Sequence, residues 1–290
     1  MRFLVTFSLL FTFLTAFNVS IKNAEVANGA TVLLEFEKEQ GIEYKVVTFD
    51  KKEFGIFSSP LNPKYSYALV PISYYEKPES KIVNIHYLNA VKEEKVKALR
   101  LEVLDGGYQK ETIQVSSQKV NPQAASVKKR ISEEYKEAMK IYTRVSKRSY
   151  LDKEFILPIE SNITSAFGRA RIYNGSLKGY HSGTDFRAKM GTPIKAANDG
   201  RVVLVKKRFY SGGTVLVDHG QGLYTCYFHM SQFNVKKGAL VQRGEVLGLS
   251  GKSGRVTGPH LHFSARINGV QVDPLQLITL MNTNILKGKQ

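Results

Sequence analysis

Three runs of β-branched and aromatic residues follow one another at short spacing: Arg201-Val-Val-Leu-Val205, Thr214-Val-Leu-Val217 and Leu223-Tyr-Thr-Cys-Tyr-Phe228. Glycine-containing segments separate them, and such turns recur from Gly191 to Gly254. Runs of this length and composition are typical of strands, and the glycine turns are typical of tight hairpins. The sequence therefore predicts a compact, mostly antiparallel β domain at residues 151–290.

Histidines gather in this predicted domain. The chain has six, at positions 86, 181, 219, 229, 260 and 262, and five of them follow residue 180. In His260-Leu-His262, alternation along a strand points both imidazoles to one face. His181 and Asp185 flank a short glycine-containing segment that can turn both side chains toward one point. Two imidazoles and a carboxylate with an open fourth position are typical of a catalytic zinc site.

The order of these motifs resembles the lysostaphin-type (LytM-like) zinc metalloendopeptidases, which cut peptide cross-links in bacterial peptidoglycan. The resemblance covers about residues 157–280. It rests on Ser165-Ala-Phe-Gly168, His181-x-x-x-Asp185, Gly191-Thr-Pro-Ile-Lys-Ala-Ala-Asn-Asp-Gly200, Val217-Asp-His-Gly220, Tyr-Phe-His229-Met, Gly248-Leu-Ser-Gly251 and Gly258-Pro-His260-Leu-His262-Phe. No His-Glu-x-x-His motif is present in the sequence, which excludes the thermolysin arrangement with its glutamate base.

The resemblance implies roles for five residues. His181, Asp185 and His262 are expected to bind one zinc ion per chain, and His229 and His260 to act in catalysis. One of this pair would activate the water, and the other would stabilise the oxyanion or protonate the leaving amine. Zinc lowers the pKa of bound water to about 7, where a histidine base suffices. Which histidine does which stays open.

Other polar residues of this domain carry weaker expectations. Arg171, Asn174 and Tyr210 are candidate substrate-binding residues because they lie close in sequence to the histidine motifs or to a glycine-rich hairpin. His219 and Cys226 fall within strand patterns and are interpreted as structural. Cys226 is the one cysteine, so the chain cannot form an internal disulfide.

Residues 18–120 are predicted to form a β-sandwich-like positioning or binding domain. Short strand patterns are separated by Gly, Pro, Asn and charged breaks. They are Thr31–Phe36, Tyr44–Phe49, Tyr65–Val70, Lys81–Tyr87, Leu99–Leu104 and Thr112–Val115. This part shows no metal-binding or nucleophile pattern, and its ligand stays open.

A helical connector is predicted between the two domains, at residues 121–150. Asn121-Pro122 ends the strand rhythm, and apolar residues then follow a helical period. The predicted stripe consists of Val127, Ile131, Tyr135, Ala138, Tyr142 and Val145. Lysine and arginine load the other faces, so the connector is expected to be a basic amphipathic helix.

The chain begins with Met1-Arg2 and an apolar run from Phe3 to Phe17. This length and flank are typical of a secretory signal peptide at residues 1–17, with an uncleaved membrane anchor as the alternative. Export to the periplasm or cell envelope is therefore expected. Contact with the membrane is expected only through this segment, if it stays uncleaved.

The net charge of +17 is concentrated in the C-terminal part. Residues 1–120 hold 15 Lys/Arg and 14 Asp/Glu, whereas residues 121–290 hold 27 and 11. Such a distribution favours an anionic polymer as partner, with a merely solvated basic surface as the alternative. An exported chain meets anionic lipid or cell-wall polymer before nucleic acid, so peptidoglycan is the expected partner and nucleic acid is not. Other cell-wall or shape-determining proteins are further candidate partners.

The sequence thus predicts an exported endopeptidase that hydrolyses peptidoglycan cross-links in cell-wall remodelling and cell shape. By resemblance, the bond is D-alanyl to meso-diaminopimelate, with a glycyl-glycine bridge as the alternative. A second reading is a catalytically silent, wall-binding regulator of another hydrolase, although all five site positions are filled. A biotinyl or lipoyl carrier is disfavoured, because Lys189-Met190 is not the Met-Lys-Met of such carriers.

Overall fold

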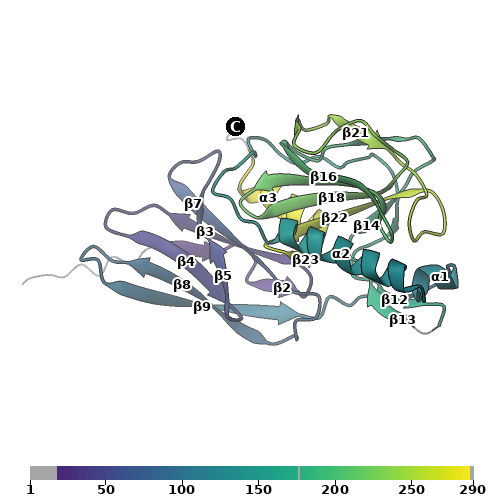
Figure 1. Cartoon of the computed structure of the whole chain (residues 1–290). Helices are drawn as coiled ribbons and strands as arrows, with labels where there is room; N and C mark the ends of the chain where they lie inside the picture. The colour runs from purple at the N-terminus through teal and green to yellow at the C-terminus, as the bar shows by residue number, and fades with distance from the viewer. Residues whose placement is uncertain (1–17, 176, 288–290) are drawn as a thin grey trace, which may run out of the picture.

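The computed structural model describes residues 18–175 and 177–287. It is mainly β, which confirms the predicted fold class, and Figure 1 shows the N-terminal sheets beside the C-terminal β domain. The predicted signal segment, residues 1–17, lies outside the described residues. Among the residues described, no helix is long and apolar enough to cross a membrane.

Two sheets form the N-terminal part. The first has the order β1-β3-β7-β6, and the second β2-β9-β8-β4-β5. All their pairs are antiparallel except β2 with β9. The bounds are β1 Val19–Ile21, β2 Glu25–Ala27, β3 Thr31–Glu37, β4 Glu43–Phe49, β5 Lys52–Gly55, β6 Phe57–Ser58, β7 Tyr65–Pro71, β8 Ser80–Leu88 and β9 Glu94–Leu104.

The β3 strand is buried on both faces, which explains its nearly continuous apolar sequence. Val32, Leu34 and Phe36 pack in the core between the two N-terminal sheets. Leu33, on the other face, packs with Tyr67 and Leu69 of β7 in the core of the C-terminal domain. Full burial of one such leucine contributes about 1.5–3 kcal/mol. The first sheet is therefore an inner layer that joins the two halves.

Polar contacts fix the same junction. The Gln276 side chain, on α3 (Pro274–Asn284), accepts from the Thr31 backbone N–H and donates to its carbonyl, both at 3.0 Å. The Tyr67 hydroxyl donates to the Gln221 side chain. Tyr74 stacks on Tyr180 with ring centroids 3.9 Å apart. These contacts hold the N-terminal sheets against the C-terminal domain in one arrangement.

The C-terminal domain is built on a sheet in the order β11-β14-β22-β18-β17-β16-β20, with β23 beside β22. The three opening sequence runs form the consecutive antiparallel strands β16, β17 and β18. A smaller sheet has the order β15-β21-β19. The bounds are β11 Ile163–Ser165, β14 Thr184–Arg187, β15 Pro193–Lys195, β16 Gly200–Arg208, β17 Gly212–Gly220, β18 Leu223–Met230, β19 Gln232–Phe233, β20 Leu240–Val241, β21 Val246–Leu249, β22 His260–Ile267 and β23 Val270–Val272.

The strand β10 (Lys110–Ile113) falls in the range predicted as sandwich, but it pairs elsewhere. It lies parallel to β12 (Ala170–Tyr173), which pairs in turn with β13 (Leu177–Tyr180). The alternating sequence of this segment indicates a strand but does not specify its partner. The linker between the two halves therefore runs along the segment that leads into His181.

Two helices, α1 (Ser117–Val120) and α2 (Ala125–Tyr142), follow β10. The buried side of α2 differs from the predicted stripe. Ala138 and Tyr142 pack on the C-terminal sheet as predicted. Tyr135, which the stripe also included, is 63% exposed, whereas its neighbour Glu134 is buried and only 7% exposed. Glu134 accepts from Arg130 Nε at 2.8 Å and from the Phe209 N–H at 2.9 Å. Because hydrogen bonds satisfy this carboxylate, it replaces the aromatic ring at the interface.

Candidate metal centre

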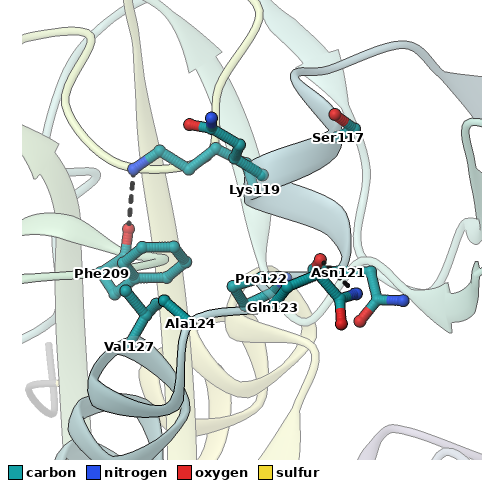
Figure 2. A pocket seen from close by; sticks show the side chains of 9 residues that line it. Ser117, Lys119, Asn121, Pro122, Gln123, Ala124, Val127 and Phe209 are labelled. Carbon is teal, nitrogen blue, oxygen red and sulfur yellow. Dashed lines mark hydrogen bonds between the residues drawn. The ribbon is translucent and has the colours of Figure 1, made fainter.

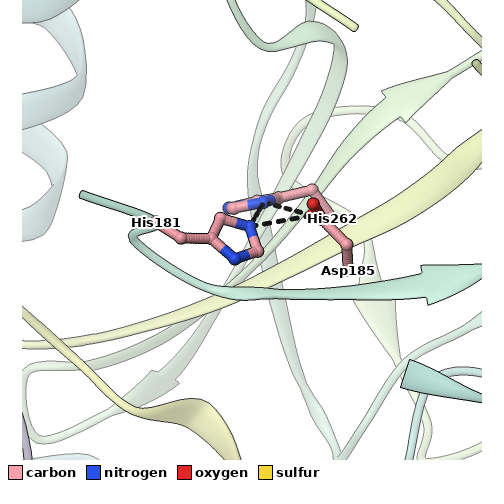
Figure 3. A group of neighbouring side chains, drawn as sticks. All are labelled: His181, Asp185 and His262. Atoms are coloured by element: carbon pink, nitrogen blue, oxygen red, sulfur yellow. Dashed lines mark hydrogen bonds and ion pairs between the residues drawn. The ribbon is translucent and has the colours of Figure 1, made fainter. Parts of the chain in front are cut away.

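Neighbouring strands bring the predicted metal ligands together. Asp185 on β14 lies directly opposite His262 on β22, so their side chains share one face of the sheet. His181 lies three residues before β14, where its backbone N–H donates to the Arg169 carbonyl at 2.8 Å. Figure 3 shows the three side chains converging from these segments. All three are buried.

The contacting atoms are a set of metal donors. His181 Nε2 lies 2.9 Å from Asp185 Oδ1 and 2.9 Å from His262 Nδ1, and His262 Nδ1 lies 2.8 Å from Asp185 Oδ1. His181 Nδ1 lies 2.8 Å from the Ala166 carbonyl, an acceptor only, so Nδ1 carries the proton of a neutral ring. The lone pair of His181 Nε2 then faces Asp185 Oδ1 and His262 Nδ1, which are themselves electron-pair donors. A cation bound between the three atoms would remove the repulsion between their lone pairs. The residues therefore fit a zinc ion.

The protonation states of His262 and Asp185 also fit a metal site. Burial lowers the pKa of His262 to about 4, so its ring is neutral near pH 7. Burial also acts to raise the pKa of Asp185, but the close approach of His181 and His262 outweighs it and holds that pKa well below its usual range. Metal ligands must be deprotonated, and both groups meet this requirement.

A second pair of histidines lies at the edge of this trio. The rings of His229 and His260 have centroids 4.8 Å apart, and His260 Nε2 lies 3.7 Å from Asp185 Oδ1. His229 Nδ1 donates to the Ser253 carbonyl at 2.8 Å, and His260 Nδ1 to the Gly258 carbonyl at 2.9 Å. Each neutral ring therefore keeps Nε2 as a proton acceptor. Burial lowers the pKa of His229 to about 3.

The backbone at His229 is strained. It has a φ of 63°, in the left-handed region that residues with a side chain rarely adopt. Its N–H donates to the Ser211 carbonyl at 2.9 Å, which helps to hold this conformation. Such strain costs about 1–3 kcal/mol and is concentrated at functional sites.

The three candidate substrate-binding residues are placed differently. Arg171 donates to Asp185 Oδ2 and to Glu111, so it supports the metal centre. The Asn174 side chain is not free for substrate, because it donates to the Val115 carbonyl and accepts from the Val115 N–H. Tyr210 lines a pocket against α2 and contacts the Arg255 guanidinium. The sequence missed Glu111, since a single glutamate in a strand pattern carries no signal.

A groove of about 560 Å³ lies beside the metal centre. The linker residues Glu111–Gln114 form one wall, and Thr257–His260 form another. Arg187 also lines it. A larger cavity, about 840 Å³, lies between α1, the start of α2 and Phe209 (Figure 2). Its lining residues include no His, Asp, Glu or Cys, so it offers no side-chain donor set for a metal.

Comparison with known proteins identifies the family of the C-terminal domain. Residues 179–274, which carry all five site residues from His181 to His262 and the whole of β14 to β22, match the sequence model of peptidase family M23. This chain carries a peptidase family M23 domain at residues 179–274.

The curated relatives match only part of this chain. The peptidoglycan DD-endopeptidase ShyA of Vibrio cholerae is 38% identical over 133 residues, 45% of this chain and 31% of ShyA. The glycyl-glycine endopeptidase ALE-1 of Staphylococcus capitis is 37% identical over 110 residues, 37% of this chain and 30% of ALE-1. The chain thus spans about a third of the length of these curated relatives.

A crystal structure shares more of the architecture. It is of a candidate M23 peptidase from Pseudomonas aeruginosa, 27% identical to this chain with a TM-score of 0.66. The match covers 87% of this chain and 94% of that one. A match of that extent includes N-terminal sheets as well as the M23 region.

Gly183 leaves no room for a side chain behind the metal centre. A Cβ there would lie 2.3 Å from the Phe263 carbonyl oxygen and 2.7 Å from His262 Nε2. We expect Gly183→Ala to displace His262, to weaken zinc binding and to lower stability by about 1–3 kcal/mol. Zinc content after dialysis and thermal unfolding measure both effects. Gly179→Ala is the control, because its nearest neighbour would be 4.0 Å away; equal behaviour of the two variants would refute the packing argument.

His219 is fully buried away from the metal ligands. Its Nδ1 donates to the Asp199 carbonyl at 2.6 Å, and its Nε2 accepts from Thr225 Oγ1 at 2.8 Å. Burial lowers its pKa to about 4. This environment is that of a structural histidine, as the sequence suggested.

The same burial predicts a pH-dependent stability. An unfolded histidine binds a proton near pH 6.5, whereas folded His219 does not until about pH 4, so stability falls as the pH drops through this window. Its share of the loss at pH 5 is about 2 kcal/mol. Urea unfolding of wild type and His219→Asn at about pH 7.5 and about pH 5 measures this share. An unchanged pH dependence in the variant would contradict the assignment.

Proposed function

We propose that this M23 protein is an exported, zinc-dependent endopeptidase that hydrolyses the peptide cross-links of peptidoglycan. One observation carries the proposal. A buried trio of metal donors, His181, Asp185 and His262, lies beside two histidines that each keep a free Nε2. This combination supplies a metal site and a proton acceptor within one small volume.

The chemistry follows from these positions. Bound at the trio, zinc would polarise the scissile carbonyl and lower the pKa of its water to about 7. One of His229 and His260 accepts the proton of the attacking water through Nε2 and passes it to the leaving amine. The other, as an imidazolium with protons on both ring nitrogens, donates a hydrogen bond from Nε2 to the oxygen that becomes negative. The carbonyl groups of Ser253 and Gly258 hold the two rings in the required tautomer.

The substrate class is inferred from the relatives and from charge. ShyA is named a peptidoglycan DD-endopeptidase, which favours the bond between D-alanine and meso-diaminopimelate. ALE-1 is named a glycyl-glycine endopeptidase, so a glycine bridge is the second candidate. The basic C-terminal part suits an anionic cell-wall polymer. The role that we assign to this activity is cell-wall remodelling and the control of cell shape.

Export is proposed from composition. The apolar run of residues 3–17 after Arg2 supports secretion to the periplasm or cell envelope. Fusion of residues 1–30 to a reporter that is active only outside the cytoplasm tests this step. An inactive reporter would contradict export.

Digestion of purified peptidoglycan sacculi tests the function. We expect the zinc-loaded protein to convert cross-linked muropeptide dimers to monomers, read by mass spectrometry, and His181→Ala to leave them intact. Unchanged dimers with a full complement of zinc would overturn the enzyme proposal and favour a wall-binding regulator. Loss of dimers with both proteins would mean that the metal site is wrongly assigned.

A further inference from the structure

Glu111 reaches the outer side of the metal centre from outside the M23 match. It lies on β10, directly opposite Arg171 on β12. Arg171 Nε donates to Glu111 Oε1 at 2.5 Å, and Arg171 Nη2 donates to Asp185 Oδ2 at 3.1 Å. A single guanidinium therefore connects the linker to a predicted metal ligand.

The two carboxylate oxygens of Asp185 have separate partners. Oδ1 faces His181 Nε2 and His262 Nδ1, and is therefore the oxygen directed at the metal position. Oδ2 is the oxygen that Arg171 holds. Arg171 thus fixes the rotation of the carboxylate, and Glu111 fixes Arg171.

The three charges alternate and are largely buried. The exposed fractions of the Glu111, Arg171 and Asp185 side chains are 18%, 14% and 10%. An unbalanced guanidinium at this distance would repel a dication and draw electron density from the carboxylate that binds it. Glu111 supplies the balancing charge. A second contact also links Glu111 to a metal ligand. Ser165 Oγ lies 3.3 Å from the Glu111 carboxylate and 3.1 Å from His181 Nδ1.

We propose that Glu111 is a positioning residue of the metal centre, which raises zinc affinity by neutralising Arg171. The proposal rests on the proposed zinc site. It makes the linker strand β10 part of the functional centre, so that the M23 region alone is incomplete. Removal of the chain up to residue 115 is therefore expected to weaken zinc binding.

A double-mutant cycle on zinc affinity tests this role without substrate. The zinc Kd of wild type, Glu111→Gln, Arg171→Gln and the double variant is measured by competition with a chelator. We expect Glu111→Gln to weaken zinc binding about tenfold, the usual effect of losing a group that supports a ligand. The same change in the Arg171→Gln background is expected to have little effect, because the charge that it balances is gone.

The matched control is Glu133→Gln, since Glu133 is exposed on α2 and pairs only loosely with Lys129 at 4.0 Å. Wild-type affinity in Glu111→Gln would overturn the proposal, and so would an equal loss in both backgrounds. Thermal unfolding of the metal-free variants separates misfolding from a local effect.

Should Glu111→Gln not fold, Arg171→Lys replaces it. The lysine keeps the charge but cannot bridge both carboxylates, so weaker zinc binding is expected. Wild-type zinc affinity in Arg171→Lys would overturn the proposal. A wild-type protein that binds no zinc would instead refute the proposed function.

Discussion

His262→Ala is expected to abolish zinc binding and cross-link hydrolysis together. His262 Nδ1 lies within 2.9 Å of both other donor atoms, so its loss leaves only two ligands at the site. Loss of a supporting group alone costs about 10–100-fold in metal affinity, and loss of a ligand is expected to cost at least about 100-fold. Zinc content after dialysis and the yield of uncross-linked muropeptides measure the two effects.

The control for this change is His86→Ala. His86 lies on β8, where its Nε2 is 3.0 Å from Thr48 Oγ1, and it belongs to the N-terminal sheets. This variant is expected to keep wild-type zinc and activity. A His262→Ala protein that holds a full zinc complement would show that the ligand assignment is wrong.

His260→Ala, only two residues away, is expected to behave differently. Its Nε2 lies 3.7 Å from Asp185 Oδ1, whereas the three donor atoms of the trio lie within 2.9 Å of one another. We therefore expect zinc to be retained and kcat to fall by about 10²–10⁴-fold, the range for a positioned acid or base. His229→Ala is expected to give the same pattern.

Parallel measurements of zinc content and kcat separate the two neighbouring histidines. The predicted result is a split, with His262→Ala losing zinc and His260→Ala losing only turnover. If both variants lost zinc equally, the two would be equivalent ligands, and His260 would have no separate catalytic role. If His260→Ala kept wild-type turnover, the acid–base assignment would be refuted.

The sequence predicted those features that local patterns encode. Alternating apolar residues between glycine turns specify β16 to β18, and the spacing within His260-Leu-His262 puts two rings on one face. The convergence of His181, Asp185 and His262 was predicted from resemblance, and the register of β14 against β22 supplies its physical basis.

Features that depend on distant partners could not be predicted. The pairing of β10 with β12 is a contact between segments about sixty residues apart, and nothing in the alternating sequence of β10 selects that partner. Arg171, predicted to bind substrate, lines the groove, but its contacts with Glu111 and Asp185 could not be read from the sequence. Burial of Glu134 in place of Tyr135 likewise depends on donors from Arg130 and the Phe209 backbone.

Zinc titration of hydrolysis tests the central claim most directly. Metal-free protein is given zinc in steps, and the conversion of purified cross-linked muropeptide dimers to monomers is followed by mass spectrometry. We predict that the rate rises in proportion to bound zinc and levels off at one ion per chain. Intact dimers at full zinc occupancy, or full hydrolysis by the metal-free protein, would contradict the account.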